Sequence, residues 1–149
     1  MDKNSFDVVV IKKGACMRVV AGVLSDEQGR VLVQKRPEGK ALAGFWEFPG
    51  GKVGAGESDE QALVREFEEE LGMPIHVLEC ITQAEHTYEH ATVQVFFYRC
   101  VLASVAGDTR VYAPQAKESQ VFRFASCREL GQLDFCEADR VFVRQLGMV

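Results

Sequence analysis

The stretch GKVGAGESDEQALVREFEEELGM, residues 51–73, contains the start and stop signals of one helix. Ser58 is a typical N-cap residue, and Gln61 three positions later completes a capping box. Gly72 stands where a helix commonly ends, and Pro74 prevents the helix from resuming. Between these signals apolar side chains recur at helical spacing, at Ala62, Leu63, Phe67 and Leu71. We therefore predict a glycine turn followed by an amphipathic helix that packs against a core.

Three glutamates of this segment, Glu66, Glu69 and Glu70, stand at i, i+3 and i+4. On a helix this spacing places the carboxylates on one face, about 5–6 Å apart at Cβ, where like charges repel. Such faces are commonly solvated surface, but here only Arg65 is available one turn away to balance them. A divalent cation between the carboxylates would remove the repulsion, and oxygen ligands suit Mg²⁺ or Mn²⁺.

The same segment resembles the signature of a known family. It matches the Nudix box, G-x5-E-x7-R-E-U-x-E-E-x-G-U with U apolar, without a departure. The matching positions are Gly51, Glu57, Arg65, Glu66, Phe67, Glu69, Glu70, Gly72 and Met73. The resemblance implies a Nudix hydrolase, which cleaves a nucleoside diphosphate linked to a further moiety. It also implies an α/β fold, the Nudix α/β/α sandwich with a mixed β-sheet.

Residues outside the box resemble the MutT branch of that family, which consists of sanitising nucleoside triphosphatases. The similar stretches are residues 33–37, 44–52, 115–124 and 135–140. The resemblance implies Mg²⁺-dependent conversion of a nucleoside triphosphate and water to a nucleoside monophosphate and diphosphate. Oxidised nucleotides such as 8-oxo-dGTP are the expected substrates, so the role would be nucleotide pool sanitisation in support of DNA replication and DNA repair.

The resemblance also implies a set of catalytic and metal-binding residues. Glu66, Glu69 and Glu70 are the expected metal ligands, with Mn²⁺ as a possible substitute for Mg²⁺. The backbone carbonyl of Gly50 and the loop residue Glu118 are the further expected ligands. Among the helix carboxylates, Glu66 is expected to activate the attacking water, directly or through a metal.

The resemblance also implies supporting roles for residues around the helix. Arg65 belongs with the catalytic group, and we expect it to pair with Glu57 and so to hold the turn against the helix. Gly51, Glu57 and Gly72 are expected to be structural. Glu68 is expected to point away from the acidic face and to be an ordinary exposed surface residue.

Expected substrate contacts lie on both sides of the box, at Arg36, Glu47, Phe48, Pro49, Gly50 and Asp139. Arg36 is expected at the phosphate side of the nucleotide, and Phe48 is a candidate to stack on the base. Some MutT-branch members carry asparagine where this chain has Asp139. An ionised aspartate only accepts hydrogen bonds, so it suits the donor edge of a guanine or of a cytosine, unless burial keeps it protonated.

Composition sets bounds on the function class. The 149 residues suit one domain, which we place at residues 15–149, with residues 1–14 as an extension of unknown role. A net charge of −5 without a basic tract argues against a nucleic-acid polymer as partner. Five cysteines without a CxxC pattern favour reduced thiols and a cytoplasmic location. The pattern of residues 1–14 matches neither a signal peptide nor a membrane span. The sequence does not predict an oligomeric state.

The remaining pattern predicts strands at residues 15–24, 30–35, 45–48, 75–83, 92–103 and 121–124, with the first two paired as a hairpin. A helical turn at 126–130 and a closing helix at 138–146 complete the chain. The H-x-x-E-H sequence at residues 86–90 resembles a zinc-protease pattern, but it runs into β-type sequence, so we assign it to a strand.

Other functions stay open on the sequence alone. Within the enzyme class these are hydrolysis of CTP or modified pyrimidine nucleotides and hydrolysis of dinucleoside polyphosphates. A nucleotide-binding module without catalysis is less favoured, since all the box carboxylates are present.

Overall fold

The computed structural model describes residues 15–89, 91–103, 113–118 and 120–147, so the predicted extension at residues 1–14 lies outside the described residues. The strands are β1 (Ala15–Leu24), β2 (Val31–Lys35), β3 (Trp46–Glu47), β4 (Gly50–Lys52), β5 (Ile75–Tyr88), β6 (Ala91–Leu102) and β7 (Val121–Ala125). The helices are α1 (Asp59–Leu71), α2 (Cys127–Leu130) and α3 (Glu137–Gly147). Within these ranges, none of the helices combines the length and apolar character that a membrane span requires.

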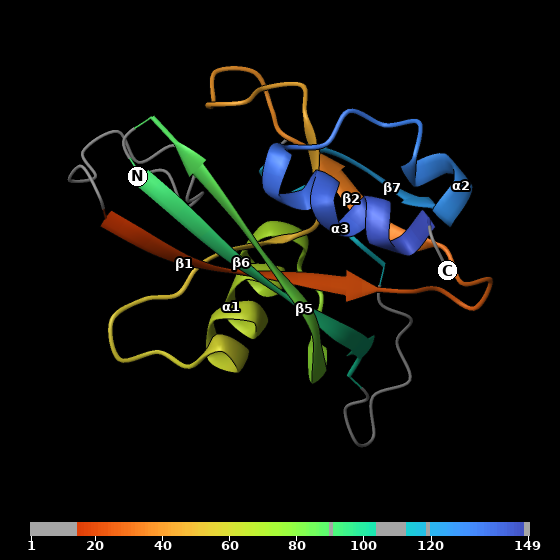
Figure 1. Ribbon diagram of the computed structural model, residues 1–149. Helices are drawn as coiled ribbons and strands as arrows, with labels where there is room; N and C mark the ends of the chain where they lie inside the picture. Colours follow the sequence, from red (N-terminus) through yellow and green to blue (C-terminus); the bar gives the residue numbers. More distant parts are fainter. Residues whose placement is uncertain (1–14, 90, 104–112, 119, 148–149) are drawn as a thin grey trace.

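The strands form two sheets, one of them mixed. The larger sheet has the order β4-β1-β6-β5, in which β1 and β6 are parallel and the other pairs antiparallel. The smaller sheet has the order β3-β2-β7 and is antiparallel throughout. Helices α1 and α3 lie on opposite sides of the long strands of the larger sheet (Figure 1). This arrangement confirms the predicted α/β sandwich.

The predicted hairpin between the first two strands is wrong. Strands β1 and β2 belong to different sheets and share only an isolated bridge between Ser25 and Val31, at the turn. Residues 19–24 of β1 are buried on both faces. One edge of β1 pairs with β6 along its whole length, and β4 occupies the other edge at residues 19–21, where β2 would have to pair in a hairpin. Local turn chemistry predicted the reversal of the chain but not the partner of each strand.

Strand β5 continues to Tyr88, five residues beyond the predicted end, and forms a long antiparallel pair with β6. His86 therefore lies on a strand, and Glu89 lies in the turn that follows. The zinc-protease pattern needs these residues on a helix, and this helix is not present. The second histidine of the pattern, His90, is outside the described residues.

Alternating residues of β1 fill two separate cores. Val19 and Val23 belong to the cluster that includes residues of α3, whereas Val20 and Leu24 belong to the cluster that includes residues of α1. This alternation follows from the period of two along a strand that is covered on both faces. Strand β1 therefore holds α1 and α3 in place relative to each other.

The predicted signals at both ends of α1 are confirmed. The Ser58 side chain accepts a hydrogen bond from the Gln61 backbone N–H, and the Gln61 side chain accepts one from the Ser58 backbone N–H. Gly72 has φ 64° and closes the last turn, with its N–H donating to the carbonyl of Glu68. A residue with a side chain would be strained in this left-handed conformation.

The expected pair between Glu57 and Arg65 joins the glycine turn to α1. Arg65 Nε and Nη2 donate to the two carboxylate oxygens of Glu57 at 2.8 and 2.9 Å, and Nη2 also donates to the Lys52 carbonyl at 3.1 Å. Glu57 in addition accepts the Gly54 backbone N–H at 2.8 Å. The hydrogen bonds from Arg65 and from Gly54 lower the pKa of the Glu57 carboxyl to about 2.

We predict that Gly22→Ala destabilises the fold. A Cβ at Gly22 would lie 2.4 Å from Cε1 of Phe67, a ring of α1 that is fully buried in the core. Overpacking of this kind costs about 1–3 kcal/mol of unfolding free energy, measurable by urea denaturation. In the double variant with Phe67→Leu the loss should be smaller than the sum of the two single losses.

Gly131→Ala is the matched control for this prediction. Gly131 has φ −64°, and an added Cβ would meet its nearest atom at 3.5 Å. The substitution should change the unfolding free energy by less than about 0.5 kcal/mol. Equal stability of Gly22→Ala and Gly131→Ala would contradict the packing argument.

A second prediction concerns acid stability. Because the folded-state pKa of Glu57 is about 2 against an ordinary value of 4.5, the pair stabilises the fold above about pH 4.5. This stabilisation is lost as the pH falls from about 4.5 toward 2. Between about pH 5.5 and pH 3, wild type should therefore lose more unfolding free energy than Glu57→Gln, measured by urea denaturation at each pH. Parallel pH profiles for the two proteins would exclude this role of the pair.

Candidate functional site

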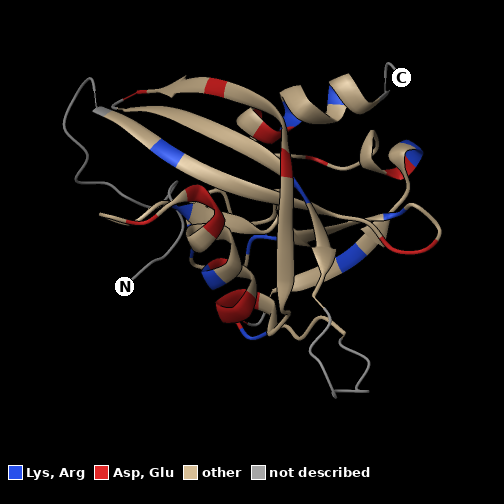
Figure 2. Cartoon of the chain, turned by 90° about the horizontal axis from the view of Figure 1, so that it is seen from below, with Lys and Arg blue, Asp and Glu red and all other residues tan. Residues whose placement is uncertain are grey.

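Of the glutamates at residues 66–70 of helix α1, two are buried, one is half-buried and one is exposed. Glu66 and Glu70 are each 1% exposed, whereas the side chain of Glu69 is 34% exposed and that of Glu68 is 61% exposed. Acidic residues along α1 are red in Figure 2, and the blue segment among them marks a basic residue. The predicted surface position of Glu68 is confirmed, and the acidic face is partly buried instead of fully solvated.

Glu66 sits between a basic side chain and a glycine. Arg65 Nη1 donates to Glu66 Oε1 at 2.7 Å and to Glu69 Oε2 at 3.4 Å. A Cβ at Gly51 would lie 2.6 Å from the Glu66 carboxylate carbon, so glycine at this position makes the space for the carboxylate. Glu66 Oε2 is buried and has no hydrogen-bond partner among the described residues.

Glu70 is held by an amide from the smaller sheet. Gln34 Nε2, on β2, donates to Glu70 Oε1 at 2.5 Å, while Glu70 Oε2 is buried without a hydrogen-bond partner among the described residues. Burial and the neighbouring carboxylates of Glu66 and Glu47 raise the pKa of Glu70 well above its ordinary value, against the opposing effect of Gln34. The site therefore contains two adjacent carboxylates with one unsatisfied oxygen each.

This donor set fits a hard divalent cation. Buried carboxylate oxygens without donors are energetically costly, and carboxylate ligands match the preference of Mg²⁺. Across the described ranges, no three Asp, Glu, His or Cys side chains converge as a complete metal cage. Glu66 and Glu70 are the members of the expected ligand set whose buried oxygens lack a hydrogen-bond partner among the described residues. The metal-binding roles of these two residues, of Glu69 and of the Gly50 carbonyl stay predictions.

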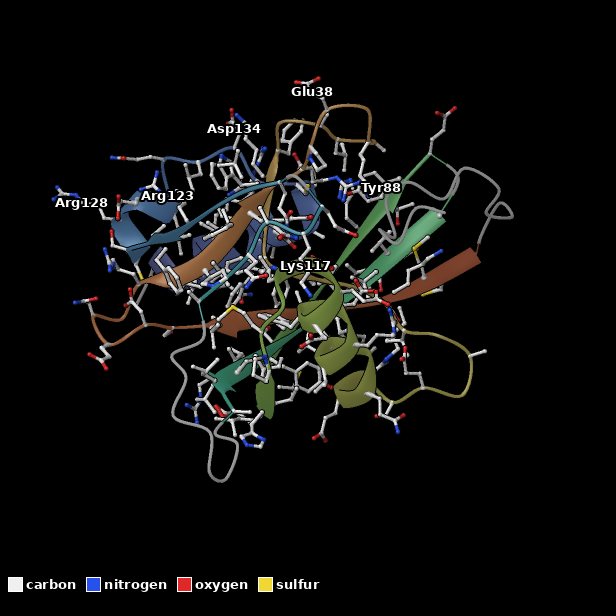
Figure 3. All side chains as sticks on the ribbon, turned by 180° about the vertical axis from the view of Figure 1, so that it is seen from behind. Glu38, Tyr88, Lys117, Arg123, Arg128 and Asp134 are labelled. Atoms are coloured by element: carbon white, nitrogen blue, oxygen red, sulfur yellow. The ribbon has the colours of Figure 1, made fainter. Side chains whose placement is uncertain are left out.

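The loop that contains Glu118 packs against the C-terminal end of α1. The backbone N–H groups of Gln115 and Lys117 donate to the carbonyls of Leu71 and Glu70 at 2.9 and 3.2 Å, and Lys117 is labelled at this end of the helix in Figure 3. The Glu118 N–H donates to Gln120 Oε1 at 2.9 Å. The fold thus brings the Glu118 backbone near the acidic helix, and its role as a metal ligand stays a prediction.

Arg36, the expected contact to the phosphate side of the nucleotide, is buried, and its role toward a nucleotide stays a prediction. It is 1% exposed, its Nε donates to the Ala41 carbonyl at 2.6 Å, and its Nη1 pairs with Glu47 Oε1 at 3.2 Å. Its backbone also bonds with Phe45 and Gly44. In this structure Arg36 therefore closes the loop between β2 and β3 and balances the buried Glu47.

Phe48 differs from the expectation that it stacks on a base. Its ring is buried at 3% exposure and packs on Phe97, Phe135 and Phe142 with centroid distances of 5.9, 5.5 and 5.3 Å. The ring is thus part of the core between the larger sheet and α3. The next residue, Pro49, is also buried, and its carbonyl accepts the Gly22 N–H at 2.8 Å.

Asp139 joins α3 to the segment between β3 and β4. Its Oδ2 accepts the Phe48 backbone N–H at 3.1 Å, and the residue is 3% exposed. Burial and the nearby Glu47 carboxylate raise the pKa of Asp139 well above its ordinary value, although Phe48 N–H and Arg36 act in the opposite direction. The burial that favours the neutral form of this aspartate is therefore present, and base recognition by Asp139 stays a prediction.

Two buried amides, Gln34 and Gln120, were missed by the sequence reasoning. They are 4% and 5% exposed, and both contact Glu70. The sequence does carry a signal for Gln34, since this polar residue directly follows the apolar run at residues 31–33 of the predicted strand. Gln120 had none, because it lies in a polar loop whose packing against α1 is visible only in three dimensions.

Comparison with known proteins agrees with this geometry. The NUDIX domain family model matches residues 20–145. An 8-oxo-dGTP diphosphatase from Haemophilus influenzae is 42% identical over 82 residues, which cover 55% of this chain and 60% of that protein. A CTP pyrophosphohydrolase from Escherichia coli is 35% identical over 123 residues, or 83% of this chain and 85% of that protein.

A solved structure shows the same fold. The crystal structure of a MutT protein from Methanosarcina mazei Go1 superposes with a TM-score of 0.76, covers 91% of this chain and 95% of its own, and is 20% identical in sequence. The family match spans most of the chain and includes the helix that holds the two buried carboxylates. The chain belongs to the Nudix family, as a MutT-like Nudix hydrolase.

Proposed function

We propose that the chain is a Mg²⁺-dependent nucleoside triphosphate pyrophosphohydrolase that acts on oxidised purine nucleotides such as 8-oxo-dGTP in the cytoplasm. Water and the nucleotide would give a nucleoside monophosphate and diphosphate. The observation that supports this best is the buried pair Glu66 and Glu70, each with one oxygen that lacks a hydrogen-bond partner among the described residues. Two such oxygens on the box helix favour a cation-binding role over a solvated acidic face.

Electrostatics explains why this site would need a cation. A triphosphate brings several negative charges to a helix face that already has three glutamates, so direct binding is repulsive. A bound Mg²⁺ would neutralise the phosphate oxygens, lower the pKa of the attacking water and stabilise the leaving diphosphate.

The residues of the chain take distinct roles in this proposal. Glu66, Glu69 and Glu70 hold the cation, with the Gly50 carbonyl and Glu118 as further ligands. Glu66 also takes up the proton of the attacking water. Arg65 keeps Glu66 Oε1 and Glu69 Oε2 oriented through its Nη1 hydrogen bonds, while its Nε and Nη2 hold Glu57. This division of contacts supports a positioning role for Arg65 within the catalytic group.

CTP is the second candidate substrate. One relative, matched over 83% of this chain and 85% of its own length, is a CTP pyrophosphohydrolase. Asp139 is compatible with either base, since an ionised carboxylate accepts from cytosine N4–H₂ or from the guanine donor edge, and a protonated one can also donate. A binding module without chemistry is disfavoured, because the box carboxylates are all present and two of them are buried.

We predict that Glu70→Gln lowers kcat by roughly 10²–10³-fold, the loss typical when one charge-stabilising group leaves an active site. The amide oxygen can still accept the hydrogen bond from Gln34, so the fold should persist. Turnover is measured as diphosphate release in Mg²⁺, and the fold by circular dichroism. Glu68→Gln, at an exposed position of the same helix, is the control and should retain turnover. Equal activity of the two variants would rule out Glu70 as a metal ligand.

The substrate is tested by a diphosphate-release screen over normal, oxidised and methylated nucleoside triphosphates, with wild type and Asp139→Ala. We expect the highest kcat/KM for 8-oxo-dGTP in wild type, or for CTP if the second candidate holds. Asp139→Ala should lower kcat/KM for the preferred nucleotide by about 5- to 150-fold, equivalent to about 1–3 kcal/mol, and change poor substrates little.

Three other outcomes of this screen would revise the proposal. Equal losses for every nucleotide would mean that Asp139 only holds the Phe48 backbone, a contact that the structure already contains. Release from no triphosphate, with turnover of dinucleoside polyphosphates, would replace the substrate class. Absence of Mg²⁺-dependent hydrolysis of any nucleotide would overturn the proposed activity as a whole.

A further inference from the structure

Two buried glutamines connect the loop that contains Glu118 to the carboxylate of Glu70. The last carbonyls of a helix have no partner within the helix, and here the loop supplies donors to them. Gln120 contributes a side-chain donor to the same place, since its Nε2 lies 2.9 Å from the Glu70 carbonyl oxygen. The end of α1 and the loop are therefore held together by backbone and side-chain hydrogen bonds.

Gln120 uses both ends of its amide in this contact. Its Oε1 accepts the Glu118 N–H at 2.9 Å, and its Nε2 donates to Gln34 Oε1 at 3.2 Å as well as to the Glu70 carbonyl. The two hydrogens of the amide nitrogen thus have separate acceptors. At 5% exposure the side chain has little access to water as an alternative partner.

Gln34 continues the connection to the carboxylates. Its Nε2 donates to Glu70 Oε1 at 2.5 Å and to Glu47 Oε2 at 3.4 Å, while its Oε1 accepts from Gln120. Two carboxylates on one side require the amide nitrogen to face them, which leaves the oxygen to face Gln120. The direction of the hydrogen bonds from Gln34 to Gln120 therefore follows from the two carboxyl groups that Gln34 Nε2 contacts.

We propose that Gln34 and Gln120 are positioning residues that couple the loop at Glu118 to the orientation of the Glu70 carboxylate. Gln34 engages Glu70 Oε1, so that Oε2 is the oxygen left for a cation. Gln120 fixes both the loop backbone and the direction of the Gln34 amide. The inference rests on the metal role of Glu70 in the proposed function.

The experiment compares Gln34→Met and Gln120→Met, which keep side-chain length and remove the hydrogen bonds. Binding of Mn²⁺ alone is measured by electron paramagnetic resonance, and amide hydrogen exchange at Glu118 by NMR in metal-free protein. Each variant should weaken Mn²⁺ binding by about 10- to 100-fold, as expected when a metal ligand loses its hydrogen-bond partner. Gln120→Met should also speed exchange at the Glu118 amide by about 5- to 10-fold, through loss of its acceptor.

The double variant tests whether the two residues act as one unit. If they do, the Mn²⁺ affinity of the double variant should be no lower than that of the single variant with the lower affinity. Gln132→Met, an exposed glutamine of the α2–α3 connection, is the control and should match wild type in both measurements. Should Gln120→Met fail to fold, Gln120→Asn, which is shorter by one methylene, replaces it.

Wild-type Mn²⁺ affinity in both single variants, or additive losses in the double variant, would overturn the proposal. These readouts do not depend on catalysis. If wild type hydrolyses no nucleotide while Mn²⁺ binding still requires both glutamines, the proposed function fails and the coupling stands. If the nucleotide is hydrolysed and neither variant affects Mn²⁺ binding, the coupling fails and the function stands.

Discussion

The burial of two neighbouring carboxylates, Glu66 and Glu70, is the constraint on which the rest of the structure depends. An ionised carboxylate without full hydrogen bonding is costly in a protein interior. Arg65 and Gln34 each satisfy one oxygen of the pair, and Gly51 provides the space. One oxygen of each carboxylate is still unsatisfied among the described residues. The proposed cation would satisfy both oxygens, at the cost of lower stability for the protein without metal.

Contacts far apart in the sequence hold the helix that bears this pair. Gly22 lets the Phe67 ring approach β1, which brings α1 against the larger sheet. At the start of the helix, Arg18 makes two hydrogen bonds to Asp59, at 2.8 and 2.6 Å. The Glu118 loop covers its other end through Gln120. These contacts place the carboxylates relative to strands of both sheets, which a short isolated helix does not achieve on its own.

The ends of helix α1 could be predicted from local sequence signals. The pairing of β1 and the burial of Phe48 depend on tertiary packing and could not. The capping box at Ser58 and the αL glycine at Gly72 follow from short-range spacing, and both are present. The partner of β1 depends on which strand edges are already paired, which no turn signal encodes. In the same way, burial of the Phe48 ring could not be predicted from its place beside the box, because its core neighbours come from β6 and α3.

The central claim is that a divalent cation relieves the buried carboxylate pair. Thermal unfolding of wild type and of the double variant Glu66→Gln/Glu70→Gln, with EDTA and then with increasing Mg²⁺, tests it most directly. The account predicts that Mg²⁺ raises the Tm of wild type to a plateau, as expected for ligand binding to the folded state. It also predicts that, in EDTA, the double variant has a higher Tm than wild type, and that the Tm of the double variant does not change when Mg²⁺ is added. The same Mg²⁺ response in both proteins, or no response in wild type, would contradict the account.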